Sequence, residues 1–191
     1  TVDAAKLDLI WTGRELLGNL FGYEKAEFDS AYVAADTVKM HEKAYIMRAL
    51  LTDLDMLNAQ HPFCTVDKWI DQAREFGQTP EVKDYYEMNA RRLITTWGGD
   101  LNDYAVRNYS GLIANYHAKR WEIYIDEAFR SVRTGTPFRD KERIKATNEF
   151  QLSFADKHGE QFPKYQGIEL LSFSRALASK YATELQSWLT K

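Results

Sequence analysis

Residues 27–60 decide the fold class, and they read EFDSAYVAADTVKMHEKAYIMRALLTDLDMLNAQ. This stretch contains no glycine or proline, and Leu50, Leu54 and Leu57 recur at the spacing of one helix face. Pro62 follows shortly after the stretch, and a helix usually ends before the residue that precedes a proline. We therefore predict that residues 27–60 form one long helix, the second helix of the chain.

The helical periodicity extends outward from this stretch in both directions. Further helices are predicted over residues 4–21, 66–76, 79–97, 102–116, 121–134, 139–157 and 170–188, with glycines at 22, 77 and 135 as stops. No segment alternates apolar and polar residues as a half-buried strand does. The sequence thus predicts an all-α fold, a single helical bundle or array of about eight helices, with residues 1–191 forming one domain.

Composition excludes several classes of partner. The net charge of −3 over 191 residues gives no reason to expect a nucleic acid or an anionic membrane surface. No run of 18 apolar residues is present, so no segment is predicted to span a bilayer.

The single cysteine, Cys64, is expected to be a buried and inert thiol. The chain begins at Thr1 without a methionine, and we expect it to be a mature or excised fragment.

The sequence shows no convincing catalytic centre. No histidine follows a glutamate at the spacing of a di-iron bundle, and His41-Glu42 lacks a second histidine because position 45 is Tyr45. Phosphate-binding glycine motifs and nucleophile elbows are absent. The acids Asp53 and Asp55 are two positions apart on a helix, so we expect them to be solvated rather than paired. We predict no metal, no cofactor and no catalytic residue within this chain.

One loop combines residue types that suit a ligand-binding site. Residues 94–104 read ITTWGGDLNDY, which places Trp97 at a helix end before two glycines. An indole there can stack on a sugar ring, while Tyr104 and Asp103 bind its hydroxyls. Alternatively, Trp97 is a core residue, the glycines only cap the helix, and Asp103 only caps the next one. The formal glycosylation acceptor at Asn108 falls within the predicted helix 102–116, where a chance match is the simpler explanation.

An ordered set of motifs lies within residues 69–121. It comprises Trp69-Ile70-Asp71-Gln72-Ala73-Arg74, Tyr86-Glu87-Met88-Asn89-Ala90-Arg91, Ile94-Thr95-Thr96-Trp97-Gly98, Leu101-Asn102-Asp103-Tyr104-Ala105, Gly111-Leu112-Ile113-Ala114-Asn115-Tyr116 and Arg120-Trp121. In this order the motifs resemble the C-terminal all-helical domain of the alpha-N-acetylglucosaminidases, glycoside hydrolase family 89. The loop after Trp97 departs from the family pattern, because it is two residues shorter.

The resemblance implies part of a retaining glycosidase that removes terminal alpha-linked N-acetylglucosamine. In that family the two catalytic glutamates lie on an upstream (β/α)₈ barrel of the same polypeptide, so this chain alone is expected to be inactive. The helical domain packs on the barrel and supplies one wall of the sugar pocket. Those wall residues correspond here to Trp97 and Tyr104, with Leu101 between them and Asp103 in support. The family also implies a secreted, periplasmic or lysosome-like location.

Two hypotheses follow from the sequence. The first is the accessory domain just described, which predicts an exposed apolar patch where the barrel docks and weak or no sugar binding by the chain alone. The second is a stand-alone helical module that binds carbohydrate or protein without catalysis, and the high aromatic fraction of 14% favours it.

Overall fold

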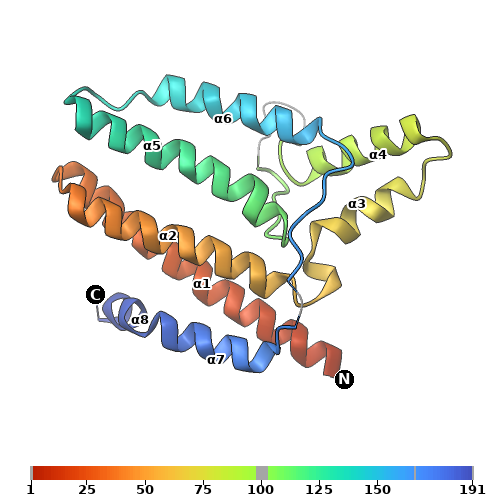
Figure 1. Cartoon of the computed structure of the whole chain (residues 1–191), viewed down its shortest axis with the longest axis horizontal. Helices are drawn as coiled ribbons and strands as arrows, with labels where there is room; N and C mark the ends of the chain where they lie inside the picture. The colour runs from red at the N-terminus through yellow and green to blue at the C-terminus, as the bar shows by residue number, and fades with distance from the viewer. Residues whose placement is uncertain (1, 98–102, 166, 191) are drawn as a thin grey trace.

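The structure, a computed structural model, describes residues 2–97, 103–165 and 167–190 (Figure 1). The α-helices are α1 (Val2–Val33), α2 (Thr37–Asn58), α3 (Val66–Arg74), α4 (Pro80–Leu93), α5 (Ala118–Thr134), α6 (Asp140–Ala155), α7 (Leu170–Lys180) and α8 (Ala182–Leu189). A 3₁₀ turn, η1 (Pro62–Cys64), and a short π-helix, η2 (Ile113–His117), precede α3 and α5. Within the described ranges, β-type pairing is limited to one bridge between Thr65 and Ser110. The all-α prediction with about eight helices is confirmed.

The helices form layers around an antiparallel pair. α1 and α2 lie along each other, α7 and α8 cover one side of them, and α5 covers the other with α6 outside it (Figure 1). The main core lies between these layers and includes the fully buried Phe28, Met47 and Leu50. α3 and α4 form a hairpin that projects from one end of this bundle (Figure 1). A second, smaller core at its base contains Ile94, Tyr116 and Phe154.

The predicted division of the first 60 residues is wrong. α1 continues through Gly22 to Val33, and the chain turns at residues 34–36 instead of running as one helix over residues 27–60. Ala35 takes a left-handed conformation with φ of 53°, and the Asp36 carboxylate accepts a hydrogen bond from the Lys39 amide as the N-cap of α2. Helix α1 is therefore the longest, with 32 residues, and α2 has 22. The cap at Asp36 outweighs the helical preference of the two alanines before it.

The segment before α5 also differs from the predicted helix over residues 102–116. Residues 106–109 form no regular helix or strand, and the Ser110 amide donates to the Cys64 carbonyl at 2.8 Å, which joins the segment to the residues just before α3. Gly111 follows with φ of 85°, close to the side chain of Val66, and helical structure begins only beyond it. Asn108 is therefore an exposed loop residue, and the mid-helix argument about its glycosylation motif is wrong.

Two acids predicted to be solvated are buried instead. Asp53 accepts hydrogen bonds from the Tyr181 hydroxyl at 2.6 Å and from the Lys180 ammonium at 2.7 Å. Tyr181 interrupts the predicted helix over residues 170–188 and separates α7 from α8. Asp55 accepts from the amides of Gly111 and Ala114 at 2.7 and 3.0 Å, which organises the turn into η2. Both acids face other elements because several helices surround α2.

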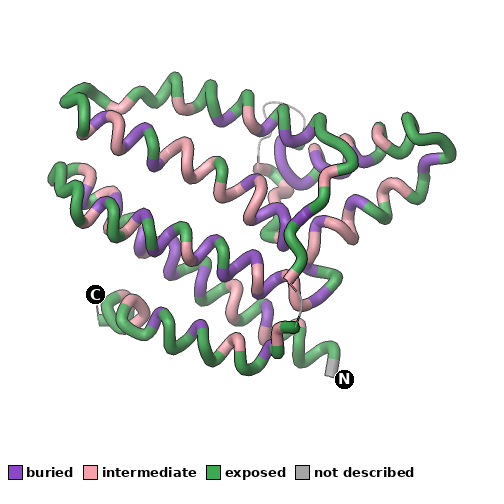
Figure 2. The backbone as a smooth tube through the Cα atoms, viewed as in Figure 1, coloured by how far each residue is buried: buried purple, intermediate pink, exposed green. Residues whose placement is uncertain are grey.

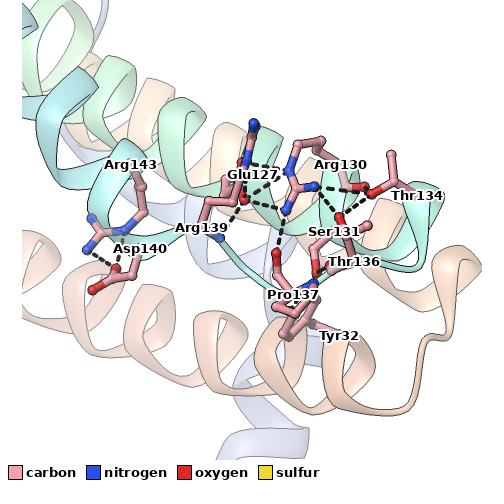
Figure 3. A network of polar contacts seen from close by, with 10 residues as sticks. All are labelled: Tyr32, Glu127, Arg130, Ser131, Thr134, Thr136, Pro137, Arg139, Asp140 and Arg143. Carbon is pink, nitrogen blue, oxygen red and sulfur yellow. Dashed lines mark hydrogen bonds and ion pairs between the residues drawn. The ribbon is translucent and has the colours of Figure 1, made fainter.

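The connection between α5 and α6 is held by a polar network (Figure 3). Gly135 ends α5 in the left-handed conformation, as its position in the sequence predicts. The Glu127 carboxylate accepts from Arg130 and from the side chain and amide of Arg139. These hydrogen bonds lower the pKa of Glu127 to about 2. The network fixes the direction in which α6 leaves the turn.

Candidate functional site

The end of α4 is built by two buried threonines and an unusual backbone turn. The Thr95 hydroxyl donates to the Arg91 carbonyl at 2.7 Å, and the Trp97 amide donates to the Arg92 carbonyl at 2.6 Å. Trp97 has φ of 54°, a conformation that bulky residues rarely adopt. The helix end therefore turns sharply and directs the indole out of the small core.

Trp97 and Tyr104 form an exposed aromatic pair. Their ring centroids are 5.3 Å apart with an angle of 53° between the planes, and their exposed fractions are 37% and 72%. Two neighbouring exposed rings with polar groups on them suit contact with a sugar. The structure thus brings together two of the residues predicted for the sugar site. Leu101, with Gly98 and Gly99, lies outside the described residues.

Asp103 is held in place by Arg120. Its carboxylate accepts two hydrogen bonds from the guanidinium, one of them at 2.9 Å, and the guanidinium lies 5.1 Å from the Tyr116 ring centroid. The Asp103 amide donates to the Thr95 carbonyl at 2.9 Å and closes the loop. The described residues 103–105 form a turn and not the start of a helix, so the capping role considered for Asp103 is wrong. Arg120 instead fixes the residue that immediately precedes Tyr104.

A cavity of about 520 Å³ adjoins this ion pair between α1, α5 and α6. Its lining includes the cations Lys25 and Arg143 and the aromatic rings of Trp121 and Tyr124, besides Asp103, His117 and Arg120. Burial lowers the pKa of His117, so its ring is neutral near pH 7. Among the described lining residues Asp103 is the one carboxylate. A glycosidase needs two carboxyl groups across the scissile bond, and these residues do not supply that pair.

The described residues do not gather a metal-binding cluster either. Within residues 2–97, 103–165 and 167–190, no three His, Cys, Asp or Glu side chains gather closely enough to hold a metal ion. Cys64 is buried as predicted, and burial raises the pKa of its thiol. None of the described helices is long and apolar enough to cross a membrane. The aromatic pair and the Asp103–Arg120 contact remain the chemically distinctive features.

Sequence reasoning missed Arg120 as a partner in the site. It appears in the motif Arg120-Trp121, but no spacing rule connects it with Asp103, which lies 17 residues earlier. Helical periodicity does place Arg120 and Tyr124 on one face of α5, and both line the cavity. That shared face was the sequence feature that could have identified Arg120 as a site residue.

Comparison with known proteins identifies the family. Residues 1–180 match the model of the alpha-N-acetylglucosaminidase (NAGLU) C-terminal domain, so the chain belongs to this family of glycoside hydrolase domains. Human alpha-N-acetylglucosaminidase is 29% identical over 185 residues, which cover 95% of this chain and 25% of the human protein. The chain therefore spans about a quarter of the length of this curated relative.

Solved structures agree on the fold. A family 89 glycoside hydrolase from Clostridium perfringens in complex with PUGNAc matches 93% of this chain and 21% of its own, with a TM-score of 0.80 and 23% identity. The same bacterial enzyme in complex with its substrate GlcNAc-alpha-1,4-galactose matches with a TM-score of 0.81 and 24% identity. At this level of identity the match establishes that the helical architecture is shared.

Proposed function

We propose that this chain is the C-terminal helical domain of a retaining alpha-N-acetylglucosaminidase and forms one wall of its pocket. Catalysis belongs to a (β/α)₈ barrel in the same polypeptide, on which the helices pack. Trp97 and Tyr104 contact the terminal alpha-linked N-acetylglucosamine, and Asp103 supports them through its pairing with Arg120. Leu101 completes the proposed set. The observation that carries the proposal is the exposed Trp97–Tyr104 pair beside a single, ion-paired carboxylate.

The family match and the coverage support this assignment. A domain that matches about a quarter of a glycosidase, and whose described cavity lining holds a single carboxylate, is suited to binding rather than to bond cleavage. Its contribution to catalysis is the positioning of the sugar, which lowers the barrier by holding the reacting bond in place. The proposed location is that of the family, namely secreted, periplasmic or lysosome-like.

The test compares the 191-residue chain with the longer polypeptide that contains it, using an aryl alpha-N-acetylglucosaminide. We expect hydrolysis with retained anomeric configuration only by the longer polypeptide. Trp97→Ala should lower its kcat/KM by about tenfold or more, since loss of a stacking contact is worth about 1–2 kcal/mol. Trp97→Phe should keep most of the activity, and Trp11→Ala serves as a control because it removes an exposed indole on α1. Full activity of Trp97→Ala would refute the pocket wall.

A second function is favoured by the same aromatic pair. If the chain is a stand-alone carbohydrate module, it should bind N-acetylglucosaminides by itself, because rings and polar groups are both already in place. Isothermal titration calorimetry of the 191-residue chain decides between the two functions. Weak or absent binding agrees with the shared pocket, whereas tight binding that Trp97→Ala abolishes would establish the module.

A further inference from the structure

Helix α4 buries charged residues and exposes apolar ones, which is the reverse of an ordinary surface helix. Its inner side buries Glu87 and Arg91, whose exposed fractions are 1% and 0%. Its outer side exposes Val82, Tyr86 and Leu93, and the helical repeat places these three within about 40° of one line. A helix that faces water on its outer side normally shows the opposite arrangement.

The exposed residues of α4 are part of a longer surface that carries apolar side chains. We call this surface the α4 stripe, and it consists of Phe76, Val82, Tyr85, Tyr86, Leu93, Trp97 and Tyr104. The Tyr86 ring centroid lies 6.0 Å from those of Phe76 and Tyr85 at one end, and Trp97 and Tyr104 pair at the other. The stripe holds seven of the seventeen large exposed apolar side chains in the described ranges. Such a concentration is typical of an interaction surface.

Charged contacts hold the inner side of α4 in place. The Arg91 guanidinium donates to Glu87 at 2.8 Å, to Glu160 at 3.1 Å and to the Phe154 carbonyl at 3.3 Å. It also lies over the rings of Phe154 and Phe162. Rotating the helix to bury the stripe would break these contacts and leave buried charges unpaired. The outer face therefore stays outward.

The hairpin of α3 and α4 is also fixed along its length. The Trp69 indole donates to the Ala90 carbonyl at 2.8 Å, and Arg74 bonds to Asp84 on the facing helix. A Cβ atom at Gly77 would lie 2.6 Å from the Lys83 amide nitrogen, so the turn between the helices is closely packed. This braced hairpin projects from the bundle (Figure 1), and Figure 2 shows exposed and half-buried positions along α4.

We propose that the α4 stripe is the surface on which the catalytic domain of the longer polypeptide docks. This inference rests on the proposed function, and it assigns the contact to one face of one helix. The chain spans 25% of the human relative and 21% of the bacterial structure, so most of such a polypeptide lies outside it. The stripe has Trp97 and Tyr104 at one end, so docking there would bring the catalytic domain against the proposed sugar wall.

The surface has the composition of an interface. Five of its seven side chains are aromatic, and its borders carry charged groups such as Lys83 and the exposed ion pair of Arg92 with Asp156. Aromatic side chains surrounded by polar groups are typical of protein contacts. The partner surface is accordingly expected to be apolar in the middle, with polar groups around it.

Hydroxyl-radical footprinting of the longer polypeptide tests the inference with internal controls. Tyr85 and Phe76 are compared with Tyr45 and Phe63, which are exposed to a similar degree but lie outside the stripe. We expect oxidation of Tyr85 and Phe76 to be slower than that of the controls by about fivefold, because an interface core excludes water. Equal rates would overturn the proposal. Protection that disappears on dilution would also overturn it, because it would identify a second copy as the occupant.

A charge placed in the stripe provides the second measurement. In the longer polypeptide, Leu93→Asp should lower the midpoint of thermal unfolding and raise the oxidation rate of Tyr85, whereas Val38→Asp, at an exposed position on α2, should change neither. An unchanged midpoint and oxidation rate in Leu93→Asp would contradict the docking surface. The two measurements distinguish a failure of the docking surface from a failure of the proposed function. Activity that depends on Trp97 without protection of the stripe refutes the docking face alone, and protection without such dependence refutes the pocket wall alone.

Discussion

The buried faces of helices α2 and α4 are stabilised by different kinds of contact. α2 buries a stripe of apolar residues that includes Met47, Leu50 and Leu57, beside the hydrogen-bonded acids Asp53 and Asp55. α4 buries Glu87 and Arg91 and exposes aromatic rings. An apolar face is stabilised by its removal from water and tolerates many partners, whereas a buried ion pair is stable only with correctly placed counter-charges. Helix α4 is therefore specified on its inner side by particular contacts, and its outer side is the proposed docking surface.

The loss of Arg91 in α4 is among the largest expected effects. Arg91→Ala should destabilise the chain by about 3 kcal/mol, since buried Glu87 would lose the fully buried one of its two counter-charges and keep only Arg74. Urea denaturation followed by circular dichroism measures the change. The double variant Glu87→Leu with Arg91→Met should cost less than Arg91→Ala, because it removes both charges and keeps the volume. A cost of Arg91→Ala below about 1 kcal/mol would show that the inner face is not held by charge.

The matching substitution in α2 is Leu50→Ala. Leu50 is fully buried in the main core, so we expect a loss of about 3 kcal/mol from lost burial and the cavity that remains. Val38→Ala on the same helix is exposed and should change the free energy of unfolding by less than about 0.5 kcal/mol. Because no charge is left unpaired, adding a second apolar truncation should not rescue Leu50→Ala. If a second truncation did restore stability, α2 would respond as α4 is expected to, and the contrast between the two helices would be wrong.

The same contrast explains which parts of the fold were predictable. The apolar stripe of α2, the Thr79-Pro80 start of α4 and the Gly135 stop of α5 were read correctly, because periodicity and end signals are local. The turn at Ala35 was missed because two alanines favour helix and hide the Asp36 cap. The contacts on the buried side of α4 were not predictable, because Arg91 and Glu160 come together only in the folded chain.

Prediction of the candidate site follows the same division. Trp97 and Tyr104 were selected from one local loop, and the structure places their rings together. Arg120 and the adjoining cavity depend on how α5 lies against the loop, which residue spacing does not encode. The sugar contacts of Trp97, Tyr104, Asp103 and Leu101 remain predictions.

The bundle also contains a charged cluster, and Glu127 tests whether it behaves as the charges of α4 do. Its pKa of about 2 lies below the ordinary value of 4.5, so it stabilises the fold above pH 4.5 and loses this effect as the pH falls toward 2. Glu127→Gln should cost about 2 kcal/mol at pH 7 through its hydrogen bonds to Arg130 and Arg139. Denaturation at several pH values should show the difference from the parent chain shrinking between pH 4.5 and 2. A difference independent of pH would exclude this ionic role.

The smallest expected effect, and the sharpest separation of the two helices, comes from Leu93→Ala. In the 191-residue chain Leu93 is exposed, so its truncation should change the free energy of unfolding by less than about 0.5 kcal/mol. In the longer polypeptide the same change should cost about 1–2 kcal/mol, because a docked partner would cover the side chain. Val38→Ala, the control on α2, should have the same small effect in both contexts. A difference between contexts at Leu93 but not at Val38 would mean that the outer face of α4 is completed by another domain, as the inner face of α2 is completed by its own chain.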